Sequence, residues 1–90
     1  MTTNEQEIQA QLTKEGFGGV ATYQDNPGFE YSEHTHEKFA VHVILEGSMV
    51  LTDKNGSKEL KAGERFDIPA GTMHSAKMGP DGCKYVVGEK

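Results

Sequence analysis

All four histidines of this 90-residue chain lie where their side chains could share one metal ion. His34 and His36 are separated by a single residue, and on a β-strand this spacing turns both side chains to the same face. His42 follows on the next apolar segment, and His74 lies much further along the chain. Because neutral imidazole is the commonest protein ligand of transition metals, the pattern predicts a metal site. A His-x-His pair alone is weak evidence, since it also occurs on solvated strands.

The segment that ends at His74 resembles the second signature motif of the cupins, which are small β-barrels with a mononuclear metal near the barrel centre. That motif reads Gly, five residues, Pro, one residue, Gly, two residues and His. It is matched in full by Gly63, Pro69, Gly71 and His74. The proline and the second glycine are turn residues that position the strand of His74. The match implies that His74 is a metal ligand.

The segment that contains His34 and His36 resembles the first cupin motif, with one departure. That motif reads His-x-His, three or four residues, Glu, six residues and Gly, and His34, His36 and Gly47 fit it. The glutamate position, counted back from Gly47, is Ala40, so the usual anionic ligand is missing. His42 lies two residues beyond Ala40, on the same face of the expected strand. We interpret His42 as the replacement ligand.

The resemblance therefore implies one divalent transition-metal ion per chain (iron, manganese, nickel or zinc), held by His34, His36 and His74, and we expect His42 to be its fourth ligand. Without a carboxylate ligand, the ion would be a stronger Lewis acid and would attract anionic molecules more strongly. Three or four protein ligands leave open coordination positions, which is typical of catalytic rather than structural metal sites. Two alternatives stay open: the histidines could be polar residues that close a barrel mouth, and His42 could be an inward side chain satisfied by a hydrogen bond.

Tyr85 and Cys83 are the other candidates for chemistry. Lys84 is expected to point to water, which turns Cys83, Tyr85 and Val87 toward the barrel interior. Tyr85 is a candidate catalytic residue, as an acid or as a hydrogen-bond donor to substrate. The alternative is an aromatic residue of the barrel wall whose hydroxyl reaches water. Cys83 is a weaker candidate nucleophile, because a lone cysteine on an apolar strand face is usually an inert small hydrophobe.

The remaining pattern predicts an all-β fold, a small barrel or jelly roll with a short N-terminal α-helix, and the resemblance implies that this fold is a small single-domain cupin β-barrel. Residues 1–90 are expected to form this single cupin domain, with a helix or arm over residues 1–16 and the β-barrel over residues 17–88. Short apolar segments separated by Gly, Asn, Asp and Pro predict strands. The expected strands cover residues 20–24, 29–36, 39–45, 48–52, 58–60, 65–68, 74–78 and 84–87.

The helix is expected over residues 3–15, which are rich in helix formers. Thr3 and Gln6 form a capping-box pattern, and Gly16 stands where a helix would stop. Leu12 and the isoleucine four residues before it give the helix a narrow apolar face. With so few apolar anchors, its expected place is on the outside of the barrel or across a dimer interface.

The strand that follows His36 is expected to be apolar on both faces. Alternate residues from Ala40 to Ile44 should face the barrel interior, and those from Val41 to Leu45 should face the other way. A strand with two apolar faces is covered on both sides, by a second sheet or by a partner subunit. The pattern therefore predicts a homodimer.

Composition and charge narrow the classes of partner. Nine Lys and Arg against fourteen Asp and Glu give a formal net charge of −5, and the basic residues are scattered singly. No nucleic-acid partner is therefore expected. The N-terminal residues lack the basic segment and apolar run of a secretory signal, and no apolar run approaches the roughly 20 residues of a membrane span. A single cysteine cannot form an internal disulfide. Together these features predict a cytoplasmic protein with no membrane partner.

The predicted metal site supports two main functional hypotheses. The first is a metal-dependent enzyme of dioxygenase or Lewis-acid type that acts on a small oxygen-rich or anionic substrate. The second is a non-catalytic cupin module that binds or senses a small molecule or a metal. A short chain leaves little material for a lid over the site, which favours the second hypothesis. A third reading keeps the ion only to stabilise a marginal core.

Overall fold

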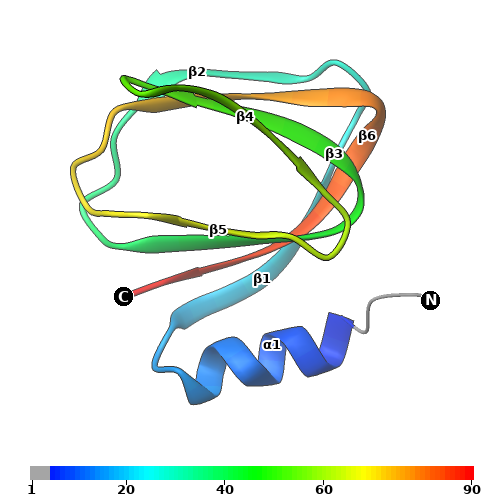
Figure 1. Cartoon of the computed structure of the whole chain (residues 1–90). Coiled ribbons are helices and arrows are strands. Elements are labelled where there is room, and N and C mark those ends of the chain that lie inside the picture. Colours follow the sequence, from blue (N-terminus) through cyan, green and yellow to red (C-terminus); the bar gives the residue numbers. More distant parts are fainter. Residues whose placement is uncertain (1–4) are drawn as a thin grey trace.

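In the computed structural model, which describes residues 5–90, one helix lies against the outside of an antiparallel β-barrel (Figure 1). The elements are α1 (Glu5–Lys14), β1 (Gly18–Asp25), β2 (Glu30–His34), β3 (Ala40–Asp53), β4 (Gly56–Lys61), β5 (Arg65–Ile68) and β6 (His74–Glu89). The predicted all-β fold with a short N-terminal helix is confirmed.

Two long strands, β3 and β6, connect the whole barrel. They pair with each other, and each also exchanges partners along its length. The first part of β3 pairs with β5 and its last part with β4, whereas β6 begins beside β2 and ends beside β1. In Figure 1 both long strands therefore pass from one layer of the barrel to the other.

The expected strand count was wrong at two places, because turn-like residues form bulges within continuous strands. The expected break at Glu46 and Gly47 is a register shift inside β3, and the two expected strands 74–78 and 84–87 are both parts of β6. Gly47 has a φ of +75°, and a Cβ atom there would collide with the carbonyl oxygen of Gly82. Glycine at position 47 therefore lets β3 bend closely against β6.

Helix α1 ends as the sequence predicts, at Gly16. This glycine has a φ of +97°, its N–H donates to the carbonyl of Thr13, and the N–H of Phe17 donates to the carbonyl of Leu12. This pair of bonds is a Schellman motif, which satisfies carbonyl groups of the last helical turn. Thr3, the expected capping residue, lies outside the described residues.

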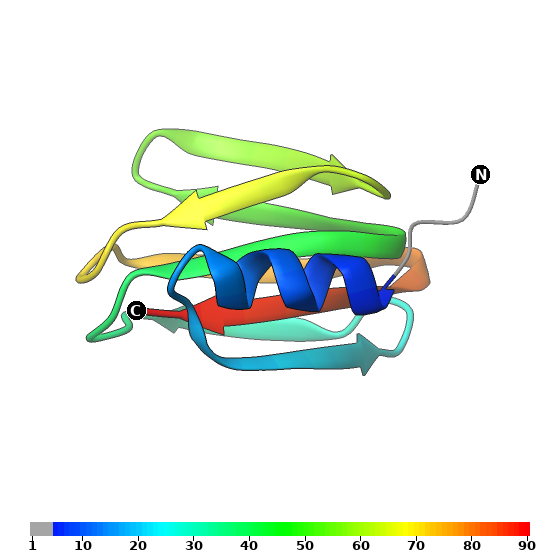
Figure 2. The same cartoon turned by 90° about the horizontal axis from the view of Figure 1, so that it is seen from below.

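The predicted alternation along β3 is confirmed, but the outer face is covered by α1 rather than by a second sheet. The inner cluster contains Ala40 and Ile44, together with Met49, Leu51, Leu60, Ile68, Met78, Cys83 and Tyr85. The outer cluster contains Val41, Val43 and Leu45, together with Leu12, Phe17 and Val86. Figure 2 shows α1 lying across β3 and β6. Because one helix already covers this apolar face, it needs no partner subunit, and the homodimer stays a prediction.

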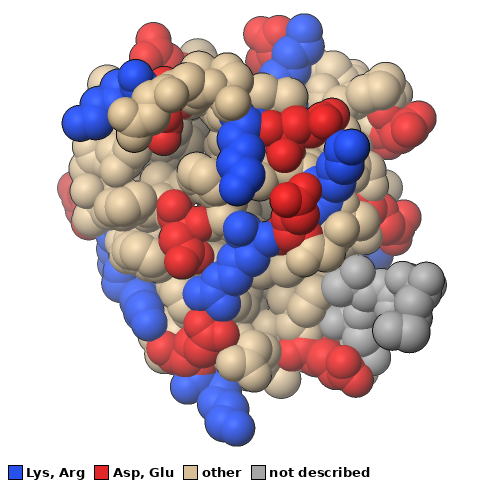
Figure 3. Space-filling model, in the orientation of Figure 1, with Lys and Arg blue, Asp and Glu red and all other residues tan. Residues whose placement is uncertain are grey.

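Charged side chains of both signs mix on the surface. Figure 3 shows Lys and Arg interleaved with Asp and Glu over one face of the molecule. One cluster fixes the end of α1 to β5: the guanidinium of Arg65 binds both carboxylate oxygens of Glu15, at 2.9 and 3.0 Å. Arg65 lowers the pKa of Glu15 to about 2. Within residues 5–90, no helix is long and apolar enough to cross a membrane.

Candidate metal centre

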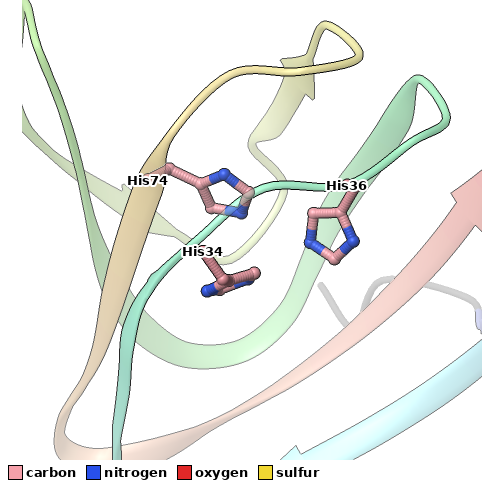
Figure 4. Close-up of side chains that lie close together, drawn as sticks. All are labelled: His34, His36 and His74. Atoms are coloured by element: carbon pink, nitrogen blue, oxygen red, sulfur yellow. The ribbon is translucent and has the colours of Figure 1, made fainter.

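Three of the four predicted ligands, His34, His36 and His74, meet at one end of the barrel (Figure 4). One ring nitrogen from each lies within 4.8 Å of those of the other two. Nitrogens bound to one ion lie up to about 4.2 Å apart, so small ring rotations would bring all three onto a shared ion. Among residues 5–90 these form the only cluster of three or more potential ligands at such distances.

The strand register explains why these histidines meet although their positions in the chain are far apart. His34 is the last residue of β2 and His74 is the first of β6, and the two are directly opposite each other in the antiparallel ladder. His36 lies in the connection between β2 and β3, where its carbonyl oxygen accepts a bond of 2.9 Å from the N–H of Gly71. The turn predicted at Gly71, which has a φ of +79°, therefore positions two of the three ligands.

Backbone carbonyl groups orient two of the imidazoles. Nδ1 of His34 lies 2.6 Å from the carbonyl oxygen of Ser32, and Nδ1 of His74 lies 2.9 Å from that of Thr72. A carbonyl oxygen can only accept, so each Nδ1 carries the proton and each Nε2 keeps its lone pair. Such a bond fixes the tautomer that a metal ligand needs.

His36 has a different neighbour. Its Nδ1 lies 3.9 Å from a carboxylate oxygen of Glu89, the last residue of β6. Burial lowers the pKa of His36, and so do His74 and His34, while Glu89 acts in the opposite direction. The imidazole is therefore favoured in its neutral form, which can bind a metal. In Figure 4, one ring nitrogen of His36 faces the other two histidines and the other nitrogen faces away from them.

His42 lines the same cavity but is not part of the close cluster. Its ring stacks against that of Tyr85, with centroids 5.8 Å apart and an interplanar angle of 25°. Its Nδ1 is buried and has no hydrogen-bond partner. Burial lowers the pKa of His42 to about 4, with further contributions from His74, His36 and His34. The structure therefore offers a neutral imidazole with an unsatisfied nitrogen beside the three-histidine cluster, and its role as a fourth ligand stays a prediction.

Tyr85 lies in the cavity wall, and its hydroxyl is held by a residue that the sequence analysis missed. It donates a bond of 2.7 Å to Oδ2 of Asp25, which also accepts one of 3.0 Å from the hydroxyl of Tyr31. Burial raises the pKa of Tyr85 above its usual range, and the bonds to Tyr31 and Asp25 add to this effect. The expected strand ended at Gln24, whereas β1 extends to include Asp25. The available sequence signal for this role was an acidic residue directly after an expected strand.

The three-histidine cluster opens into a cavity of about 260 Å³. Its wall is mostly apolar and aromatic, and includes Met49, Leu51, Ala76, Met78 and Val87. This volume is near the small end of the range for ligand pockets, so it suits a small molecule. The other reactive candidate, Cys83, is buried in the inner cluster, and burial raises the pKa of its thiol to about 11. A thiol in this state is a poor nucleophile.

The residues present fit a divalent transition-metal ion. Two imidazoles are fixed with Nε2 available, a third completes the cluster, and His42, whose buried Nδ1 has no hydrogen-bond partner, lines the same cavity. Histidine nitrogen is a donor that suits zinc, iron, nickel and copper, and three protein ligands leave positions for a substrate.

Comparison with known proteins places the chain in a family. A model of the AraC-like ligand-binding domain matches residues 16–87. Dimethylsulfoniopropionate lyase DddW from Ruegeria pomeroyi is 30% identical over 70 residues, which is 78% of this chain and 45% of the lyase. The chain therefore spans less than half the length of that relative.

Two solved structures share the fold. A cupin-2 domain protein from Shewanella frigidimarina is 25% identical, with a TM-score of 0.67 over 76% of this chain and 65% of that protein. Oxalate decarboxylase from Bacillus subtilis, studied for its Mn(II) centres, is 20% identical, with a TM-score of 0.71 over 79% of this chain and 20% of the decarboxylase. At that identity the second likeness concerns the fold alone. The chain belongs to the AraC-like ligand-binding domain family of the cupin superfamily.

Proposed function

We propose that this chain is a mononuclear metal-dependent enzyme that acts on a small anionic substrate. The observation that carries the proposal is the convergence of His34, His36 and His74 at the end of an apolar cavity, with the Nε2 atoms of two of them freed by backbone acceptors. A cluster built only for structural stability would need no adjoining cavity, whereas a substrate must reach the ion.

The chemistry favoured is of the Lewis-acid type. A bound divalent ion would polarise a carboxylate or carbonyl oxygen of the substrate. Neutral imidazole ligands leave the site positively charged, which favours an anion. The related lyase is named for dimethylsulfoniopropionate, a zwitterion that carries a carboxylate, and this supports a carboxylate group on the substrate of the present chain.

Residues of the cavity wall would orient the substrate. His42 is neutral and lines the cavity, so its imidazole can bond a polar group of the substrate or complete the metal site. The hydroxyl of Tyr85 is committed to Asp25, so it is a poor proton donor in this arrangement. The apolar remainder of the wall would exclude water around the substrate's carbon atoms.

The first test is elemental analysis of the full chain purified without an affinity tag or a chelator, beside His74→Ala. We expect close to one divalent transition-metal ion per chain in the parent protein and almost none in the variant. The metal-loaded parent is then incubated with small carboxylates, including dimethylsulfoniopropionate, while oxygen consumption is monitored. Metal-dependent conversion without oxygen uptake supports Lewis-acid chemistry, and conversion with oxygen uptake supports a dioxygenase instead. A parent that binds no metal after reconstitution contradicts the proposal.

The second candidate function is a ligand-binding module without turnover. It is favoured by the family match, since the matching model describes a ligand-binding domain. Under this function, small carboxylates should raise the melting temperature of the metal-loaded protein without being converted. Conversion of any compound that also raises the melting temperature would exclude the passive module.

A further inference from the structure

We infer that Glu89 is a positioning residue of the metal centre: its carboxylate accepts the Nδ1–H of His36 and supplies the negative charge that Ala40 cannot. This inference rests on the proposed metal site. It assigns a role to a residue at the end of β6 that the sequence analysis placed beyond the barrel.

The strand register brings Glu89 to the position that the sequence leaves empty. In the antiparallel ladder between β3 and β6, Glu89 is directly opposite Ala40. Residues directly opposite each other in such a ladder direct their side chains to the same face of the sheet. Ala40 belongs to the inner cluster, and Glu89 lines the cavity. The carboxylate of Glu89 therefore reaches the cavity from β6. A longer side chain at position 40 would have reached the same region from β3.

The three imidazoles of the cluster differ in what faces their Nδ1 atoms. Those of His34 and His74 each have a backbone carbonyl oxygen as acceptor. Nδ1 of His36 faces the carboxylate of Glu89 instead. Because the two nitrogens of one ring point in divergent directions, a proton held on Nδ1 by Glu89 leaves Nε2 for the ion. All three ligands would then use the same tautomer.

The distance between His36 and Glu89 can close without disturbing the core. At 3.9 Å, Nδ1 and Oε2 are an ion-pair distance apart, about 1 Å longer than a hydrogen bond. The side chain of Glu89 is 43% exposed and that of His36 is 34% exposed, so both have room to rotate. Metal-ligating histidines commonly donate their other ring N–H to a carboxylate, which raises the basicity of the ligand.

The negative charge of Glu89 complements the positive charge of the ion. Among the described residues that line the cavity, Glu89 is the only one with a carboxylate. Three neutral imidazoles leave the full charge of the ion uncompensated, and a carboxylate adjoining one ligand reduces it. Without such a carboxylate, the three-histidine site would bind the cation less tightly.

The test measures zinc affinity and the tautomer of each histidine in the full chain. Zinc binding is followed by competition with a chelator for the parent, Glu89→Ala, Glu89→Gln and the control Glu46→Ala. Glu46 is an exposed carboxylate on β3 that pairs with Lys84 at 3.9 Å and does not line the cavity. Long-range ¹H–¹⁵N spectra of the zinc-loaded proteins report which ring nitrogen of each histidine carries the proton.

We expect Glu89→Ala to weaken zinc binding about 10- to 100-fold. We expect Glu46→Ala to match the parent and Glu89→Gln, which keeps an acceptor oxygen but loses the charge, to lie between. The parent spectrum should show Nδ1–H on His36, and that signal should weaken or broaden in Glu89→Ala while those of His34 and His74 persist. A purely structural role of Glu89 would not single out His36.

Two results would overturn the inference while leaving the proposed function intact. One is zinc affinity in Glu89→Ala equal to that of the parent, with binding still abolished by His74→Ala. The other is Nε2–H on His36 in the zinc-loaded parent, because the ion would then be bound through the nitrogen that faces Glu89. A parent that binds no zinc or other divalent transition metal would instead overturn the proposed function together with this inference.

Discussion

The two faces of β3 are both largely apolar in sequence but serve different purposes. On the outer face, Val41, Val43 and Leu45 belong to one buried cluster with Leu12 of α1 and Phe17. On the inner face, His42, Met49 and Leu51 line the cavity that contains the histidines. The outer face is filled and the inner face is partly hollow.

This difference shows how a short chain can keep a binding cavity. A domain of this size buries a limited part of its surface, so an internal cavity removes packing that it can hardly spare. Helix α1 compensates by covering the outer face with Leu12, which is 1% exposed. We therefore expect stability to depend chiefly on the outer cluster and ligand binding to depend on the inner one.

The largest effect is expected when the outer cluster loses its helical anchor. Leu12→Ala should lower the free energy of unfolding by about 2–5 kcal/mol, because a buried leucine is replaced within a filled cluster. Urea denaturation measures the loss, and Ile8→Ala, at a partly buried position, should cost less. If Leu12→Ala costs less than about 1 kcal/mol, the outer face does not carry the stability.

A smaller effect on stability is expected from protonation of His42 on the inner face. The pKa of His42 is about 4 in the folded protein, against 6.5 for an unperturbed histidine, so the unfolded chain binds the proton more readily. The folded protein therefore keeps its full stability above pH 6.5, where the ring is neutral in both states, and loses stability as the pH falls toward 4. For the metal-free protein the loss should total about 3 kcal/mol.

The control for this pH dependence is His42→Gln. Urea denaturation of both metal-free proteins at several pH values between 7 and 4 isolates the contribution of His42, because the carboxyl groups titrate in both. The parent should lose more stability than the variant over this interval. Parallel curves would show that His42 is not desolvated and that the inner face is more open than described.

The smallest effect on stability is expected from removal of the hydroxyl groups that bind Asp25. Tyr85→Phe removes the hydroxyl that donates to Asp25 and should lower the free energy of unfolding by about 1–2 kcal/mol. Tyr31→Phe removes the second donor to the same carboxylate, but Tyr31 is 36% exposed and water can replace its hydroxyl. Thermal denaturation should therefore rank Tyr85→Phe below Tyr31→Phe in stability. The reverse order would contradict the assignment of Tyr85 to the buried wall.

Much of the site could be predicted because its signals are local. The spacing of His34 and His36 predicts that they act together, and both join the cluster although β2 ends at His34. Gly71 and Pro69 mark the turn before His74. The inward and outward alternation along β3 also follows from sequence, since a strand has a period of two residues. These features depend on neighbours that are close in the chain.

The parts that were missed depend on which strands pair and in which register. Glu89 gains its importance only from its position opposite Ala40, and Asp25 only from meeting Tyr85, 60 residues away in the chain. Gly47 was interpreted as a reversal because glycine fits both a turn and a bulge. Its close approach to Gly82 decides between them, and no local pattern reveals that contact.

The path of β6 has a mechanical consequence for the site. This strand of 16 residues begins at His74 and ends at Glu89, and both of its ends lie at the same end of the barrel, while the bend between them lies at the opposite end (Figure 1). A change in curvature at the bend would alter the separation between the two tips of the strand. A substitution at the bend, on the far side of the molecule, is therefore expected to act on the metal site through the backbone of β6.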